Sequence, residues 1–144
     1  MPISTVPHPA PPGQVAAPAP RPTTIGMVST YPPTQCGLAT FSAALIQHLH
    51  LTTGSLGVVQ VVDEVGPRPG PDVVAQLVNG SPDSAGAAVR SLNGFDVVVV
   101  QHEYGIYGGR DGADVLAIVD ALTVPAIVVM HTVLQDPTAS GRAP

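Results

Sequence analysis

The sequence predicts an α/β protein in which helices flank a mostly parallel sheet. Short apolar runs alternate with helical stretches from Thr24 onward, as expected when a crossover helix joins one strand to the next. Two of these runs, Phe95–Gln101 and Val124–Met130, are apolar on both faces, which is typical of strands buried between two helix layers. Only 10% of the residues are charged and 44% are hydrophobic, so the folded part should bury most of its length.

Each expected strand is a run of β-branched and other apolar residues that stops at a glycine, a proline or a polar side chain. The run at 73–78 is too short to classify by periodicity, and its valines and the Asn79-Gly80 stop favour a strand. Phe95–Gln101 should be a central strand. The expected strands are Thr24–Thr30, Leu56–Val62, Val73–Val78, Phe95–Gln101 and Val124–Met130.

The expected helices are recognised by apolar residues at helical spacing or by start and stop signals. A serine followed by a proline is a good helix start, and Asn-Gly is a good stop. The segment Tyr31–Leu38, with two prolines and a glycine, should be a loop. The three helices are one around Phe41, Leu45 and Leu49 that ends near 52–54, one from Ser81-Pro82-Asp83 to Asn93-Gly94, and one from Asp111 through Leu122.

A length of 144 residues allows one domain of normal size. Residues 1–23 are rich in proline and alanine and predict a flexible leader without chemistry of its own. Residues 24–137 should form the folded Rossmann-like domain, and residues 138–144 a disordered tail.

The composition excludes several functions. The net charge is −5, and the five arginines are dispersed, so nucleic acid is not an expected partner. The absence of lysine excludes Schiff-base chemistry and a P-loop of the G-x-x-x-x-G-K-[ST] type. Cys36 is the only cysteine and cannot form an internal disulfide, and no apolar run is long enough to span a bilayer. We expect a cytoplasmic protein.

Polar side chains follow the ends of several expected strands. In an open parallel sheet, ligands bind outside the carboxyl ends of the strands, where loops and helix N-termini converge. We therefore expect a ligand site at this edge. The residues concerned are Thr30 and Tyr31, Asp63 and Glu64, Gln101, His102 and Glu103, and His131 and Thr132.

The loop at 31–40 could bind a ligand. Gly37 would let the backbone approach a ligand closely, and the N-terminus of the following helix would favour an anion such as phosphate. The alternative is that Gly37 only tightens a turn. This loop is not G-x-G-x-x-G, so it does not predict dinucleotide binding.

The string Gln101–Gly109 is the strongest candidate for chemistry. His102 and Glu103 could bond sugar hydroxyls or transfer protons, or His102 could instead anchor the glycine loop by hydrogen bonds. A zinc-protease motif would need a histidine where Ile106 stands, so no metal site is expected. No local signature supports Cys36 as a nucleophile with His102 or His131, and His131 could be structural.

Three segments together resemble a known family. YPPTQCGLATF at 31–41, VVVVQHEYGIYGGRDG at 97–112 and VVMHTVL at 128–134 are similar to the N-terminal domain of family 4 glycosyltransferases of the GT-B fold. The likeness is closest to a bacterial subgroup with a Q-H-E-[YF]-G-[IF]-[YF]-G-G string. The segments occur in the order of the family, and the region over which they are spread takes in most of the chain from 24 to 137.

The resemblance implies a hexosyltransferase that retains anomeric configuration and uses a nucleotide-sugar as donor substrate, without a cofactor. The family's first domain mainly receives the acceptor, which is a sugar, a glycan or a lipid, and its second domain binds the donor. The resemblance implies catalytic roles for His102 and Glu103 and substrate-binding roles for Gly37, Tyr31, Gln101, Tyr104, Gly108, Gly109 and His131.

The family's second domain has no counterpart in this sequence, which ends just after the strand that closes at Met130. We therefore expect an incomplete N-terminal half of a GT-B fold that has no useful transferase activity alone. An exposed apolar surface where further sheet would pack should allow self-association. The alternative function is a non-catalytic α/β module that binds a nucleotide or a phosphorylated ligand at the loop of Gly37.

Overall fold

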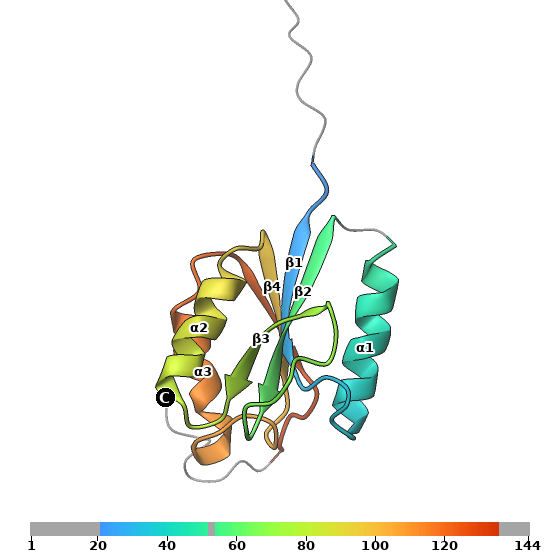
Figure 1. The fold of residues 1–144 in the computed structure, drawn as a ribbon. Coiled ribbons are helices and arrows are strands. Elements are labelled where there is room, and N and C mark those ends of the chain that lie inside the picture. The colour runs from blue at the N-terminus through green and yellow to red at the C-terminus, as the bar shows by residue number, and fades with distance from the viewer. Residues whose placement is uncertain (1–20, 52–53, 136–144) are drawn as a thin grey trace, which may run out of the picture.

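The computed structural model describes residues 21–51 and 54–135. Within these ranges it has the expected α/β architecture, a Rossmann-like sheet with all strands parallel in the order β3-β2-β1-β4-β5 (Figure 1). Residues 1–20 of the predicted leader and the predicted tail at 138–144 lie outside the described residues. The strands are β1 (Thr24–Ser29), β2 (Ser55–Val62), β3 (Val73–Val78), β4 (Val97–His102) and β5 (Ala126–Met130).

The described helices cover both faces of the sheet, with α1 on one face and α2 and α3 on the other (Figure 1). A buried cluster beneath α1 joins it to β1, β2 and β3, and includes Met27, Ile46 and Val58. A larger cluster beneath α2 and α3 includes Val100, Leu92 and Ile118. The helices are α1 (Gly37–Leu49), α2 (Pro82–Leu92) and α3 (Asp114–Asp120), and a short 3₁₀ turn covers Arg110–Gly112.

Several element boundaries differ from their expected places, and local structure explains two of them, the starts of α1 and α3. Helix α1 begins at Gly37, inside the expected loop, because the Cys36 thiol caps it by accepting the N–H of Ala39 at 3.3 Å. Strand β4 begins at Val97 rather than at Phe95. Helix α3 begins only at Asp114, because Asp111 and Gly112 adopt positive φ angles of 54° and 79°.

The expectation that Val124–Met130 is buried on both faces is wrong. Strand β5 pairs with β4 and forms an edge of the sheet, and its side chains are mostly exposed. The exposed fractions reach 56% for Ile127 and 47% for Met130, because the clusters beneath the described helices do not include β5. The expected exposed apolar surface is therefore present at this edge.

Two glycines leave room for an aromatic ring to pack against the sheet. Gly26 in β1 and Gly57 in β2 are partners in the parallel ladder, and both face Phe95. A Cβ atom on Gly26 would lie 2.8 Å from the Phe95 ring, and one on Gly57 would overlap the same ring and approach Val74. The absence of two side chains thus creates the site into which Phe95 packs.

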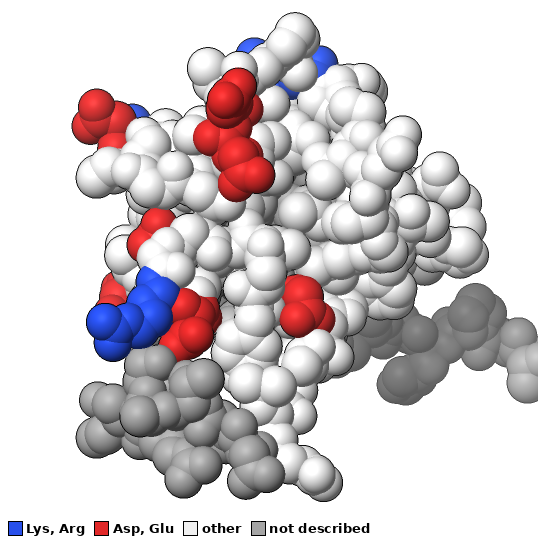
Figure 2. All heavy atoms as spheres, turned by 90° about the horizontal axis from the view of Figure 1, so that it is seen from below, with Lys and Arg blue, Asp and Glu red and all other residues white. Residues whose placement is uncertain are grey.

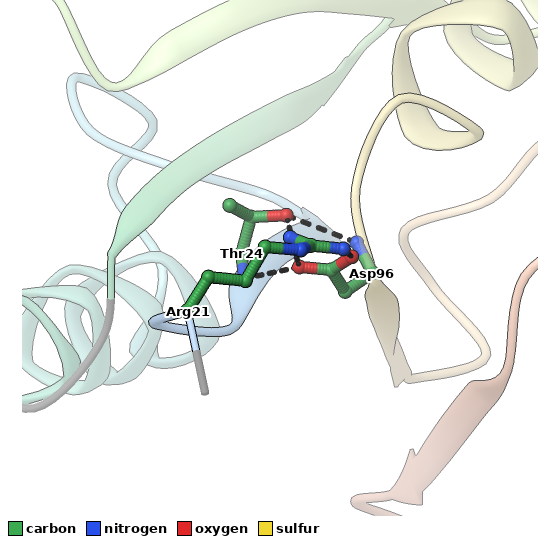
Figure 3. A network of polar contacts seen from close by, with 3 residues as sticks. All are labelled: Arg21, Thr24 and Asp96. Carbon is green, nitrogen blue, oxygen red and sulfur yellow. Dashed lines mark hydrogen bonds and ion pairs between the residues drawn. The ribbon is translucent and has the colours of Figure 1, made fainter. Parts of the chain in front are cut away.

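At the amino ends of the strands, hydrogen bonds link Asp96, just before β4, to Thr24, the first residue of β1 (Figure 3). Its carboxylate accepts hydrogen bonds from the backbone N–H and the hydroxyl of Thr24, at 2.8 and 2.9 Å, and from the guanidinium of Arg21. The Asp96 N–H donates back to the Thr24 hydroxyl at 3.0 Å. The hydrogen bonds from Arg21, followed by those from Thr24, hold the pKa of the Asp96 carboxyl well below its usual range.

We predict that Gly57→Ala lowers the free energy of unfolding by about 1–3 kcal/mol, because the added methyl must displace the Phe95 ring from a filled site. Urea unfolding measures the loss. The control is Gly66→Ala, since a Cβ there would have no neighbour within 4 Å. Equal stability of the two variants would contradict the packing described for Phe95.

Candidate functional site

The parallel strands end at one edge of the sheet, the lower edge in Figure 1, and Figure 2 shows this edge face-on. The β4–β5 ladder continues past the strand ends, because the N–H of His131 donates to the carbonyl oxygen of His102 at 2.9 Å. This pairing holds the segment after β4 beside the segment after β5. Much of the surface in Figure 2 is uncharged, and acidic groups outnumber basic ones.

A cavity of about 350 Å³ opens where the start of α1 meets these two segments. We call it the rim cavity. Of the residues predicted to form the site, Gly37, Glu103 and His131 line it. Its complete lining is Cys36, Gly37, Leu38, Phe41, Glu103, Ile106 and His131.

A second cavity of about 260 Å³ adjoins the rim cavity and shares Cys36 and Ile106 with it. It extends along the strand ends to Asp63, which follows β2, and to Asn79, which follows β3. With Thr30 after β1, polar side chains that follow all five described strands therefore lie along this edge, as the strand directions predicted.

The N-terminus of α1 is already capped by the protein itself. The Cys36 sulfur accepts the Ala39 N–H and lies 3.3 Å from the hydroxyl of Thr30. Burial raises the pKa of the Cys36 thiol, but hydrogen bonds with Thr30 and with the N–H groups of Ala39 and Leu38 outweigh it and leave the pKa below its ordinary value. The backbone groups expected to cradle an anion are thus partly engaged by this side chain.

Glu103 is held in a defined orientation at the rim cavity. Its Oε2 accepts the Thr132 hydroxyl at 2.7 Å, and its Oε1 accepts the N–H of Tyr104 at 3.1 Å. Each carboxylate oxygen retains lone pairs for further donors. Glu103 can therefore accept hydrogen bonds from ligand hydroxyls without being reoriented.

His131 also lines the rim cavity. Its Nε2 is 2.6 Å from Oε1 of Gln101, and its ring meets the Phe41 ring edge to face, with the centroids 5.3 Å apart. Gln101 is fully buried and does not line the rim cavity. The predicted substrate-binding residue Gln101 therefore reaches the cavity only through His131.

His102 lies on the other face of the sheet. Side chains alternate along a strand, and Val98 and Val100 belong to the cluster beneath α2 and α3, so His102 points to that side too. Its ring contacts Tyr104 edge to face at 5.2 Å and lies 6.1 Å from the Tyr107 ring. The predicted catalytic pair is thus divided, because Glu103 lines the rim cavity and His102 does not.

The tyrosines of the segments at 31–41 and 97–112 also make contacts within the fold. The Tyr107 hydroxyl donates to the backbone oxygen of Gln101 at 2.8 Å, and burial raises the Tyr107 pKa. Tyr31 packs against the cluster beneath α1 and donates to Asp72 at 3.2 Å. Burial, then the charge of Asp72 and this hydrogen bond, raises the Tyr31 pKa. Neither Tyr31 nor Tyr104 lines the rim cavity.

Gly108 and Gly109 are required by packing. A Cβ atom on Gly108 would lie 2.5 Å from Oδ2 of Asp114, and one on Gly109 would lie 2.6 Å from Oδ1. Gly109 also has a φ angle of 78°, which favours glycine. The glycine pair therefore lets the loop after β4 close over the start of α3, away from the rim cavity.

The sequence analysis missed Asn79 as a site residue and used it only as a strand stop. Its Oδ1 accepts the Gly108 N–H at 2.8 Å, and its Nδ2 donates to Asp63 and to the carbonyl of Ile106 at 2.9 and 3.1 Å. Its place directly after β3 was a signal that could have identified it. Asn79 fixes the loop that carries Ile106 into both cavities.

Within residues 21–51 and 54–135, no three histidine, cysteine or carboxylate side chains gather as a group that could hold a metal ion. No helix in the described part of the chain is long and apolar enough to cross a bilayer. Comparisons with protein families, with curated proteins and with solved structures find no match to this chain.

We predict that Asn79→Ala lowers the free energy of unfolding by about 1–2 kcal/mol and speeds amide hydrogen exchange in the 105–109 loop, because that loop loses two hydrogen bonds to Asn79. The matched control is Asn93→Ala, which removes two hydrogen bonds at the other edge of the sheet. It should cost similar stability without changing exchange at 105–109. Unchanged exchange in the Asn79 variant would show that this side chain does not hold the loop.

Proposed function

We propose that this chain forms the acceptor-side domain of a retaining, family 4 type glycosyltransferase, in which a nucleotide-sugar is the donor and a hydroxyl-bearing sugar, glycan or lipid is the acceptor. One observation carries the proposal. Each of the three segments that resemble the family contributes to the rim cavity, Gly37 from the first, Glu103 from the second and His131 from the third. These three segments are far apart in the sequence. A common ligand would account for their meeting at one cavity.

The chemistry of the lining supports a sugar as the ligand. A sugar offers hydroxyl donors around its ring and apolar C–H faces above and below it. The Glu103 carboxylate can accept hydroxyl hydrogen bonds, and charge-assisted bonds of this kind are the stronger ones. Phe41, Leu38 and Ile106 provide apolar walls against which a sugar face can pack.

The alternative, a module that binds a nucleotide or another phosphorylated ligand at the loop of Gly37, has less support. The Cys36 thiol already accepts the Ala39 N–H at the start of α1, and the Glu103 carboxylate in the same cavity would repel a phosphate. No arginine is among the described residues that line the two cavities, and the chain has no lysine.

The same charge argument defines the part of the reaction that this chain would perform. A departing nucleoside diphosphate needs positive charge or aligned N–H groups to stabilise it. The rim cavity instead presents a carboxylate and a histidine, which suit the orientation of an acceptor hydroxyl. On this proposal the donor is held by a separate domain, and the chain alone transfers no sugar.

We predict that a panel of neutral monosaccharides shifts the amide resonances of Gly37, Glu103 and His131 in NMR spectra of the 144-residue chain, whereas uridine diphosphate and inorganic phosphate do not. Glu103→Gln should weaken the binding of any responding sugar about tenfold, because a charge-assisted hydrogen bond becomes a neutral one. The control is Asp120→Asn, an exposed carboxylate at the end of α3.

Shifts caused by phosphate and by uridine diphosphate, with none from the sugars, would favour the phosphate-binding module instead. Sugar transfer by the isolated chain from a nucleotide-sugar would contradict the assignment of donor binding to a separate domain. A response to sugars confined to residues at the amino edge, such as Asp96, would contradict the location of the site.

A further inference from the structure

The contact between Gln101 and His131 has features that packing alone does not explain. Gln101 is fully buried in β4, and its Oε1 approaches Nε2 of His131 to 2.6 Å. The other end of the same amide, Nε2 of Gln101, is buried and has no hydrogen-bond partner among the described residues. A buried amide that leaves a donor unpaired is a cost to stability.

The orientation of the Gln101 amide, with Oε1 toward His131, determines where the proton lies on the histidine ring. An amide oxygen can only accept a hydrogen bond, so the ring nitrogen that faces it must carry a proton. In the neutral ring the proton is then on Nε2, and Nδ1 has a free lone pair. His131 is exposed and lines the rim cavity, so Nδ1 is open to a donor from outside the protein.

We propose that Gln101 is a positioning residue that holds His131 in the Nε2–H tautomer, so that Nδ1 can accept a hydrogen bond, or a proton, from a hydroxyl bound in the rim cavity. The use of that acceptor for a sugar hydroxyl rests on the proposed function. The tautomer itself does not, because it depends only on the contact with Gln101.

Several contacts keep Gln101 in place for this role. Its neighbours in β4 pair with β1 on one side, and Gln101 itself pairs with Val129 of β5 on the other. Its backbone oxygen accepts the Tyr107 hydroxyl. Phe41 packs against the His131 ring, so the ring has an aromatic contact as well as the contact with Gln101. Both partners of the 2.6 Å hydrogen bond are therefore fixed before a ligand arrives.

The stability of one variant separates this role from a structural one. Gln101→Met has similar length and flexibility and removes both the acceptor and the unpaired donor. If Gln101 only held the fold together, this change would destabilise the protein. If Gln101 is retained to select a tautomer, Gln101→Met should unfold at the same temperature as the wild-type chain or at a higher one.

The test is the ¹⁵N chemical shift of the two His131 ring nitrogens, recorded without ligand on the 144-residue chain at a pH where the ring is neutral. We expect Nε2 to show the shift of a protonated nitrogen and Nδ1 that of an unprotonated one. In Gln101→Met both shifts should move toward each other, as the second tautomer becomes populated. In the matched control Gln60→Met, which changes another buried glutamine of the sheet, they should stay as in the wild type.

Gln101→Glu adds a further check, because it keeps an acceptor oxygen and should leave Nε2 protonated. The proposal is overturned if Gln101→Met unfolds at a lower temperature than the wild-type chain, if Nδ1 carries the proton in the wild-type chain, if Gln101→Met leaves both shifts unchanged, or if Gln101→Glu loses the proton on Nε2. None of these results depends on sugar binding, so a failure of the proposed function would be seen separately.

Discussion

The structure of the candidate site depends on the parallel pairing of β4 with β5. The Gln101↔Val129 and His102↔Met130 pairs, followed by the hydrogen bond from the His131 N–H to the His102 carbonyl, align the two strands up to and beyond their ends. This alignment places Glu103 beside Thr132 and Gln101 beside His131. A shift of one residue in this register would turn every side chain of β5 to the other face and separate both pairs.

The two faces of the sheet are packed differently at this edge. On the side of α2 and α3, the rings of His102, Tyr104 and Tyr107 and the close packing of Gly108 on Asp114 fill the space. On the side of α1, the buried cluster involves β1, β2 and β3, so the ends of β4 and β5 stay open. The rim cavity lies where this helix begins, and the segments that follow β4 and β5 add the polar side chains of Glu103 and His131 to its apolar walls.

Much of the architecture could be predicted from the sequence because it depends on local patterns. The apolar runs located all five strands, and Ser81 before Pro82 located the start of α2. The site was only partly predictable. Gly37, Glu103 and His131 were expected at the site, and they do share a cavity. The placement of His102 and Glu103 on different sides could not be predicted, because it follows from side-chain alternation at the end of β4, and the sequence does not show which residue ends that strand. The role of Asn79 depends on contacts to residues distant in sequence, and the exposure of β5 depends on which strands the helices cover.

The most direct test of this account uses Cys36, the only cysteine, which lines the rim cavity. A nitroxide spin label attached there should broaden the amide NMR signals of Ile106 and His131 strongly and leave those of Gly94 and Asp96, at the amino edge of the sheet, nearly unchanged. Sharp signals from Ile106 and His131, with broadening of Gly94 or Asp96, would show that the three segments do not meet at one edge and would remove the basis of the proposed site.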